Sequence, residues 1–256
     1  MMGRAVSVHG ETVVKIQEPG ASRRERLRTL AGRAVGQQTG LFVVPGIVSF
    51  DDSRGEIVFE QLQLTGLRQA LSERERSLEL VGRAAVALAA IHGQMRSGEI
   101  SIEMQPGALG ISPGRDSVPL HGDFGMHNVC YLPASDEIAI IDWANAEWTG
   151  VDADLGPPEI DVAVFLVSLF HRRPFGPWPV SRRHELARNF LDRYTAAGPH
   201  GLDIDSLRTI VAAIGPEHAR LTRRLKGNLR ALGYYHNMID LYFFLRRLSG
   251  NVFAAR

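Results

Sequence analysis

The chain has 256 residues and a mass of 28.2 kDa, with 45% hydrophobic and 22% charged residues. This composition excludes a disordered or fibrous protein, and the length allows one large core or two lobes. The formal net charge of +1 gives no overall field that would attract nucleic acid, so we expect no nucleic-acid partner.

The single cysteine, Cys130, excludes an internal disulfide and fits a reducing compartment. The N-terminal stretch "MMGRAVSVHGE" lacks the apolar segment of a signal peptide, and no window approaches the ~18 apolar residues of a membrane span. The sequence therefore predicts a cytoplasmic protein that does not associate with a membrane.

Strand signals and one helical stretch fill residues 1–66. Two β-branched runs around Gly10 predict a hairpin, and a second strand pair is predicted around the turn at 51–55. The segments are "AVSV" with "TVVKIQ", and "GLFVVPGIVSF" with "GEIVFEQLQL". Between the two pairs, the Arg-rich stretch "ASRRERLRTLAGRAVG" predicts a helix. We expect residues 1–66 to form a β-rich lobe that binds nucleotide.

Helical periodicity dominates residues 67–256. Ser72 and Glu75 have the spacing of a capping box ahead of a helix of about five turns. Further helical patterns occur in "DVAVFLVSLFH", "SRRHELARNFLDRYTAAG", "DIDSLRTIVAAI" and residues 217–248. The sequence therefore predicts an α+β fold of two lobes, in which residues 67–256 form the larger, helical lobe.

A group of polar residues lies between the helical regions. In "HGDFGMHN", Asp123 and Asn128 are five residues apart, and Asp142 ends the apolar run "EIAIID". In the catalytic loop of protein kinases, an Asp and an Asn at this separation receive the proton of the acceptor hydroxyl and bind Mg²⁺. A carboxylate at a strand end would give the same cation a second oxygen ligand. The pattern indicates phosphoryl transfer, in which positioning and charge neutralisation carry most of the rate.

The run "HGDFGMHNVCY", followed by "IIDWANAEW" and "PEIDVAVFL", resembles the aminoglycoside phosphotransferase and choline kinase family, relatives of the protein kinases. The family motif is matched at His121, Gly122, Asp123, Asn128, Ile141, Asp142 and Trp143. The similarity extends from about Ala5 to Phe170. It implies a protein kinase-like two-lobe fold, ATP and Mg²⁺ as cofactors, and an alcohol group as phosphoryl acceptor.

The resemblance also implies roles for individual residues in the large lobe. Asp123 corresponds to the catalytic base, and His121 would support the catalytic loop through hydrogen bonds. Asn128 and Asp142 correspond to the Mg²⁺ ligands. Asp161 matches an Asp that braces the loop, which is a structural role.

In the small lobe, Lys15 of "VVKIQ" lies where the family has its phosphate-binding lysine. Lysine is used twice in a chain otherwise rich in arginine, and an ammonium suits α- and β-phosphate oxygens. Glu25 is the best candidate for its usual helix partner, although a solvated helix face is an equally good interpretation of "SRRERLR". The stretch "FEQLQLTG" resembles the hinge, where backbone groups from Glu60 to Leu62 would meet adenine.

One departure from the family concerns the start of the chain. The family has a first strand and a phosphate-covering loop before the lysine strand pair, whereas Met1, Met2 and Gly3 alone precede "RAVSV". The resemblance therefore implies that this strand and loop are shortened or absent. A partner protein that completes the nucleotide site is one expectation. A kinase-like, non-catalytic regulatory subunit that needs a partner is the alternative to an active kinase.

The acceptor pocket is expected in the C-terminal helices. Residues 217–256 carry far more arginine than acid, which is the wrong sign for a polycationic aminoglycoside. A small molecule, or a peptide Ser or Thr in natural-product biosynthesis, fits this charge better. An equally good interpretation is that these arginines form a solvated face of a helix.

Several other polar and aromatic residues have structural interpretations. His92 and the pair Trp143 and Trp148 are expected to pack in the interior. The acidic stretch 152–154 and Glu147 could be a solvated loop or could orient a cationic substrate. A transition-metal site formed by His121, His127 and Asp142 is a further alternative.

Overall fold

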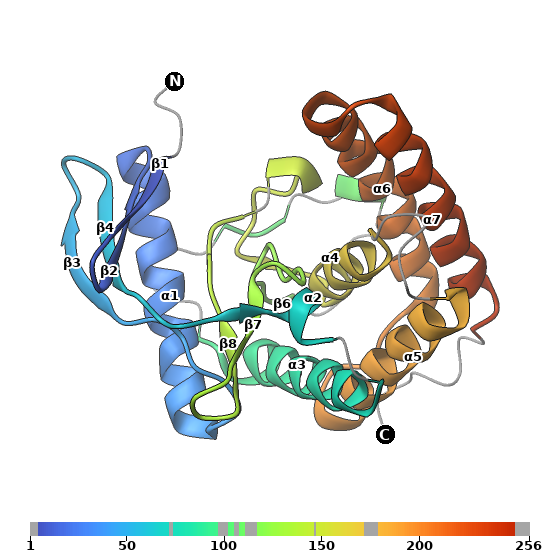
Figure 1. Cartoon of the computed structure of the whole chain (residues 1–256), viewed down its shortest axis with the longest axis horizontal. Coiled ribbons are helices and arrows are strands. Elements are labelled where there is room, and N and C mark those ends of the chain that lie inside the picture. Colours follow the sequence, from blue (N-terminus) through green and yellow to red (C-terminus); the bar gives the residue numbers. More distant parts are fainter. Residues whose placement is uncertain are drawn as a thin grey trace.

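The structure is a computed structural model, which describes residues 5–71, 74–96, 102–104, 108–110, 117–145, 147–171 and 179–248. It has two lobes (Figure 1). A small lobe contains strands β1 to β4 and helix α1, and a larger lobe contains the helices from α3 to α7. No helix in these ranges is long and apolar enough to cross a membrane.

The small lobe is built on an antiparallel sheet with strand order β1-β2-β4-β3. Its strands are β1 (Ala5–His9), β2 (Thr12–Ile16), β3 (Ile47–Asp51) and β4 (Glu56–Glu60). The predicted hairpin is present, with Gly10 at φ +58° in its turn, a conformation that favours glycine. The second pair is shorter than predicted, since residues 40–46 form no strand and contribute a single bridge at Val43.

Helix α1 (Pro19–Thr39) is longer than the predicted stretch. Pro19 begins it, where the missing N–H costs nothing, and Gly40 ends it in the left-handed conformation at φ 66°. Its buried face is polar and includes Glu25, Arg28 and Thr29. A polar buried face needs partners, and these lie in the large lobe as well as in the sheet.

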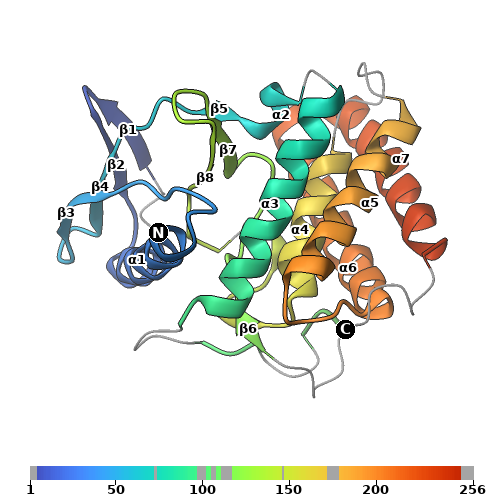
Figure 2. The ribbon, with the colours of Figure 1, turned by 90° about the horizontal axis from the view of Figure 1, so that it is seen from below.

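The large lobe is organised around α4 (Glu159–Phe170), all of whose residues are buried. Figure 2 shows α3, α4 and α5 side by side, with α6 and α7 beyond them. The surrounding helices are α3 (Arg74–Gln94), α5 (Val180–Ala197), α6 (Ile204–Lys226) and α7 (Asn228–Arg246). Helix α4 therefore lies in the apolar core, which gives the segments that contact it a rigid support.

The last two helices differ from the prediction in where they divide. Helix α6 continues through Pro216, and the break comes at Gly227, whose φ of 85° and ψ of 172° suit glycine. The predicted division near 214–217 was therefore wrong. Ser72 of the predicted capping box lies outside the described residues, as does most of the Pro-rich stretch at 172–181.

Short elements between the lobes hold the polar segment. Strands β7 and β8 form a hairpin that pairs with β5, while β6 pairs with β9. These elements are β5 (Thr65–Gly66), α2 (Leu67–Ala70), η1 (Ala108–Gly110), β6 (Val118–Pro119), β7 (Val129–Leu132), β8 (Glu137–Ile140), η2 (Glu147–Thr149) and β9 (Leu155–Gly156). The predicted strand "EIAIID" ends at Ile140, so Asp142 follows it in the loop.

Candidate active site

The loop from His121 to Asn128 connects β6 to β7 and holds Asp123 by local hydrogen bonds. The Asn128 side-chain nitrogen donates to both the backbone oxygen and Oδ2 of Asp123, each over 2.9 Å. His127 Nε2 lies 3.2 Å from the same Oδ2. Oδ1 of Asp123 is buried and has no hydrogen-bond partner among the described residues. One carboxylate oxygen is thus fixed by two contacts, and the other is without a partner among the described residues.

Asp161, at the start of α4, braces this loop from below. Its carboxylate accepts from the backbone nitrogens of His121, over 2.7 Å, and Gly122, over 2.8 Å. His92 Nε2 lies 3.1 Å from the same carboxylate, and His92 Nδ1 contacts the hydroxyl of Tyr194. These contacts lie in the buried core, so Asp161 and His92 act on the shape of the loop.

His121 is fully buried between the rings of Phe124 and Trp143. Its Nδ1 accepts the backbone N–H of Asp123 over 3.3 Å, which requires a neutral imidazole. Burial lowers the pKa of His121 to about 4. The His121 side chain is too deeply buried to touch a substrate, and its contact with the Asp123 N–H is one that would support the loop.

Asn128 and Asp142 lie next to each other at the end of the β7–β8 hairpin. The Ile141 nitrogen donates to the Asn128 oxygen over 3.0 Å, which brings the two segments together. Because the Asn128 side-chain nitrogen is used by Asp123, its Oδ1 is the atom left for a cation. Asp142 has the left-handed φ of 59°, a strained conformation for a non-glycine residue and one that occurs often at functional sites.

This donor set fits Mg²⁺. Magnesium is usually held by one or two protein oxygens together with substrate phosphates, and keeps several waters. The described residues contain no group of three or more His, Cys, Asp and Glu side chains suited to a metal. His127 instead contacts Asp123, and His121 accepts a backbone N–H. The arrangement thus favours a hard cation that arrives with phosphate over a transition-metal site.

Lys15 on β2, in the small lobe, contacts Asp142 of the large lobe. Its side chain is buried, forms an ion pair with Glu25 of α1, and donates to Asp142 Oδ1 over 2.9 Å. Gln17 donates to the second oxygen of Glu25 over 2.6 Å. Glu25 is buried, so the solvated-face interpretation of this residue was wrong. Glu25, Lys15 and Asp142 thus form a chain of contacts from α1 to the end of β8, in which Glu25 and Lys15 are buried and Asp142 is half-buried.

A pocket of about 200 Å³ lies between the lobes beside this chain. Its walls include every residue predicted to bind the nucleotide, namely Lys15, Glu25, Glu60 and Leu62, together with Asp142. Val6, Val13, Phe59 and Ile141 provide apolar contacts. The volume is below the roughly 300–1,000 Å³ typical of pockets for drug-sized ligands, so it suits a base and not a whole nucleotide.

The segment that resembles the hinge lies along this pocket, which Glu60, Gln61 and Leu62 line. The Gln61 nitrogen donates to Glu11 over 2.8 Å, and the Glu60 nitrogen donates to Gly46 over 2.9 Å. These two amides are therefore occupied. The backbone oxygen of Glu60 and the nitrogen of Leu62 are left as the candidates to meet adenine.

Burial and neighbouring charges act in opposite directions on the Asp123 carboxyl. Burial raises its pKa, while the contacts with His127 and Asn128 lower it, and the net direction is upward. Burial lowers the pKa of His127, but Asp123 outweighs this, so the net shift is upward. A carboxylate with raised pKa is a better proton acceptor, which suits a general base.

The sequence did not indicate the residues that connect α1 to the catalytic loop. Arg28 is buried and donates to the backbone oxygen of Leu120 over 2.7 Å and to Asn145 Oδ1 over 2.5 Å, and it contacts the oxygen of His121. Asp154 is also buried and accepts from Arg24 Nε over 2.8 Å. The interpretation of Asp154 as part of a solvated loop was therefore wrong. Glu147 belongs to η2, but its side chain lies outside the described residues.

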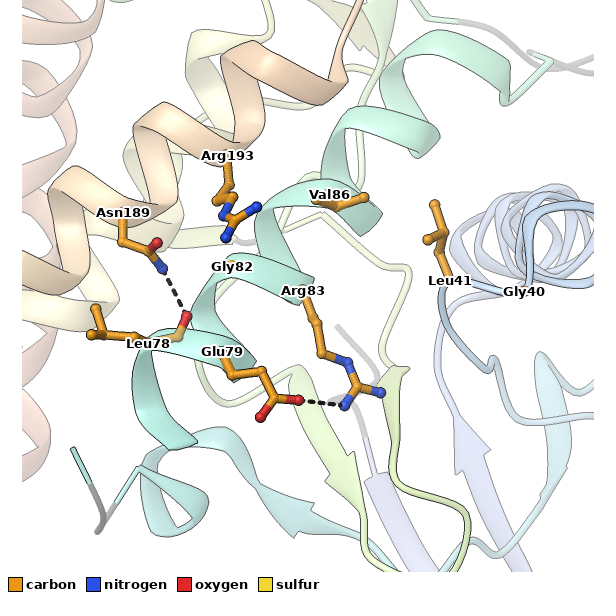
Figure 3. Close-up of a pocket in the computed structure, with 9 residues that line it drawn as sticks. All are labelled: Gly40, Leu41, Leu78, Glu79, Gly82, Arg83, Val86, Asn189 and Arg193. Atoms are coloured by element: carbon orange, nitrogen blue, oxygen red, sulfur yellow. Dashed lines mark hydrogen bonds and ion pairs between the residues drawn. The ribbon is translucent and has the colours of Figure 1, made fainter. Parts of the chain in front are cut away.

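A larger hollow lies elsewhere on the molecule. It has a volume of about 620 Å³ and is formed by α3, α5 and the end of α1 (Figure 3). Leu78, Glu79 and Arg83 line it on one side, and Asn189 and Arg193 on the other. None of the predicted site residues lines this hollow. Size alone would therefore select a different location from the one that the sequence predicts.

No protein-family model and no curated protein sequence matches the chain. Solved structures with the same fold include a glucosamine kinase, at 17% identity and a TM-score of 0.62 over 94% of this chain and 80% of that one. A choline/ethanolamine kinase family protein from Mesorhizobium loti matches at 11% identity and a TM-score of 0.54, over 97% of this chain and 86% of that one. Aminoglycoside phosphotransferase APH(3'')-Id from Streptomyces rimosus matches at 14% identity and a TM-score of 0.52, over 82% of this chain and 87% of that one. This chain therefore has the protein kinase-like two-lobe fold that these kinases and phosphotransferases share.

Proposed function

We propose that this protein is an ATP-dependent phosphotransferase that moves the γ-phosphoryl group of ATP to an alcohol. The observation that carries the proposal is the state of Asp123. One of its carboxylate oxygens is held by Asn128 and His127, and the other is buried without a partner among the described residues. That second oxygen is where an acceptor hydroxyl would deliver its proton.

The residues around Asp123 would bind the phosphates, the Mg²⁺ ion and the adenine base. Lys15 would contact phosphate oxygens, while its ion pair with Glu25 fixes the position of the ammonium. Asn128 Oδ1 and Asp142 would hold Mg²⁺, which neutralises charge on the phosphates when it is bound. The pocket lined by Glu60 and Leu62 would take the adenine base. Each of these roles is a proposal that rests on position and chemistry.

We infer that the acceptor is a small molecule or a peptide Ser or Thr and not an aminoglycoside. Between residues 217 and 248 the acidic residues are Glu217 and Asp240. Glu217 pairs with Arg220, and Asp240 pairs with Arg183 and His184. Both carboxylates are thus neutralised within the chain, and a polycation would find arginines around them. A cytoplasmic role in natural-product biosynthesis is consistent with this choice.

The experiment that tests the proposal is an ADP-release assay with Mg²⁺ and ATP against a panel of hydroxyl compounds and Ser/Thr peptides. We expect turnover with at least one acceptor and a matching phosphorylated product by mass spectrometry. Asp123→Asn should lose about 10²–10⁴-fold of that turnover because it lacks the base. A wild-type protein that binds Mg²⁺-ATP but transfers phosphate to no acceptor would favour the alternative, a regulatory subunit.

A further inference from the structure

The outward face of α7 is apolar and exposed. Its large side chains retain 40–65% of their accessible surface, far more than a core helix usually leaves open. These residues are Leu232 (65%), Tyr235 (44%), Ile239 (57%), Tyr242 (40%) and Phe243 (52%). Figure 1 shows α7 at the outer edge of the large lobe, on the side away from β1 to β4.

The five side chains form one stripe, because their spacing of three, four, three and one follows the helix repeat. The opposite face of α7 is already used, since Tyr234, Asn237, Leu241 and Leu245 are buried against the lobe. A helix that is apolar on both faces is normally covered on both. A contiguous exposed apolar patch of this size marks an interaction surface.

The stripe is symmetric about its centre. Tyr235 and Phe243 lie four residues to either side of Ile239. If a second α7 packs antiparallel across a twofold axis at Ile239, the two isoleucines meet and each Tyr235 faces the partner's Phe243. Such a self-complementary contact is the isologous interface of a C2 dimer, and aromatic pairs add to its stability.

The area is sufficient for such a contact. From their exposed fractions, and with about 150–250 Å² for each aromatic side chain, the five residues offer roughly 500 Å² per copy. Two copies would bury about 1,000 Å² from these residues alone, which reaches the lower limit for a specific interface before any flanking residues are added. We propose that the protein forms a homodimer through antiparallel packing of the α7 stripe.

Charge predicts how this dimer responds to salt. Arg246 and Arg247 are exposed at the end of α7, and antiparallel packing brings them to the start of the partner's α7. The helix dipole is positive there, so the contact is repulsive. Added salt should screen this repulsion and strengthen the dimer. An acidic partner protein on the same face would respond in the opposite way.

Sedimentation equilibrium of the full chain tests the proposal. At protein concentrations up to about 100 µM we expect a mass of twice 28.2 kDa, with tighter association at about 500 mM than at about 50 mM NaCl. Ile239→Glu places two carboxylates on the axis and should give a monomer. Val48→Glu changes an equally exposed aliphatic residue on β3, at 61% exposure, and should leave the dimer intact.

Cysteine crosslinking provides a second measurement that does not depend on affinity. Ile239→Cys places one thiol of each copy on the axis, and diamide, as oxidant, should take up the two thiol hydrogens and leave an interchain disulfide. The native Cys130 is buried, and burial raises the pKa of its thiol to about 11, so it should not react. Val48→Cys is the matched control and should stay monomeric.

Three results would overturn the proposal. They are a monomeric wild type at both salt concentrations, a dimer that survives Ile239→Glu, and crosslinking of Val48→Cys to the same extent as Ile239→Cys. In each case the α7 stripe would not be the contact of a homodimer. Circular dichroism of each variant checks that it is folded, which we expect because both positions are exposed.

Discussion

Arg28 of α1 donates from Nη2 to the backbone oxygen of Leu120 over 2.7 Å, and the same nitrogen contacts the oxygen of His121. Glu25, one turn earlier on α1, forms the ion pair with Lys15. One helix therefore holds both the lysine of the small lobe and the catalytic loop of the large lobe. The position of α1 therefore sets the distance between the two halves of the proposed active site.

Arg28→Ala should disturb this connection. The change leaves the buried Asp154 with one fewer cationic neighbour and three backbone or amide oxygens without their donor, so we expect a loss of about 3–5 kcal/mol in unfolding free energy. Urea denaturation measures it. Arg23→Ala on the exposed face of the same helix is the control and should change stability by less than about 0.5 kcal/mol. Equal losses in the two variants would remove Arg28 from this role.

Gly32→Ala tests how closely α1 packs on the large lobe. A Cβ at Gly32 would overlap the ring of Trp143, whereas a Cβ at Gly20 on the same helix meets nothing within 4 Å. We therefore expect Gly32→Ala to destabilise by about 1–3 kcal/mol despite the better helix propensity of alanine. Gly20→Ala should be neutral or slightly stabilising. A thermal melt of both variants decides, and a stabilised Gly32→Ala would contradict the close contact.

The buried His121 should make the stability of the protein depend on pH. Burial lowers its pKa to about 4, from about 6.5 in an unfolded chain, so the unfolded state binds more protons between these pH values. Stability should therefore fall as the pH drops from about 6.5 to 4, by up to about 3 kcal/mol from this residue. His121→Asn keeps an acceptor for the Asp123 N–H and cannot titrate. Its stability should fall less over this range, and an unchanged slope would contradict the assignment.

Lys15→Met tests the small-lobe contact with the nucleotide. Methionine keeps the length of the side chain and loses the charge, so Mg²⁺-ATP affinity should fall by about tenfold or more as the ammonium–phosphate contact is lost. The variant also leaves Glu25 buried without its cation. Lys15→Arg therefore serves as the control for charge and should recover stability more than affinity. Full ATP affinity in Lys15→Met, measured by calorimetry, would argue against phosphate binding there.

The sequence predicted the two-lobe fold and most helices because these depend on local periodicity and on a motif confined to residues 121–143. It also indicated Lys15, Glu25, Glu60 and Leu62, which the fold brings to one pocket. It could not indicate Arg28 or Asp154. On an Arg-rich helix, a buried arginine looks the same as a solvated one, and its partners at Leu120 and Asn145 are distant in the sequence.

The boundary between α6 and α7 could also not be predicted from the local sequence pattern. Pro216 normally ends or kinks a helix, so the sequence favoured a boundary there. In the fold, α6 continues through this residue while α4 and α7 pack against it. Tertiary packing therefore outweighed the local signal, and the break moved to Gly227.

The most direct test of the proposed function is whether the protein binds ATP together with Mg²⁺ at the pocket between the lobes. We expect Mg²⁺-ATP to raise the melting temperature of the wild-type protein by several degrees, since a ligand at about 100 times its Kd adds roughly 2.7 kcal/mol. Asp123→Asn should keep that rise, and Asp142→Ala should abolish it. If the wild type shows no shift, or if Asp142→Ala shows the full shift, the proposed phosphotransferase site is contradicted.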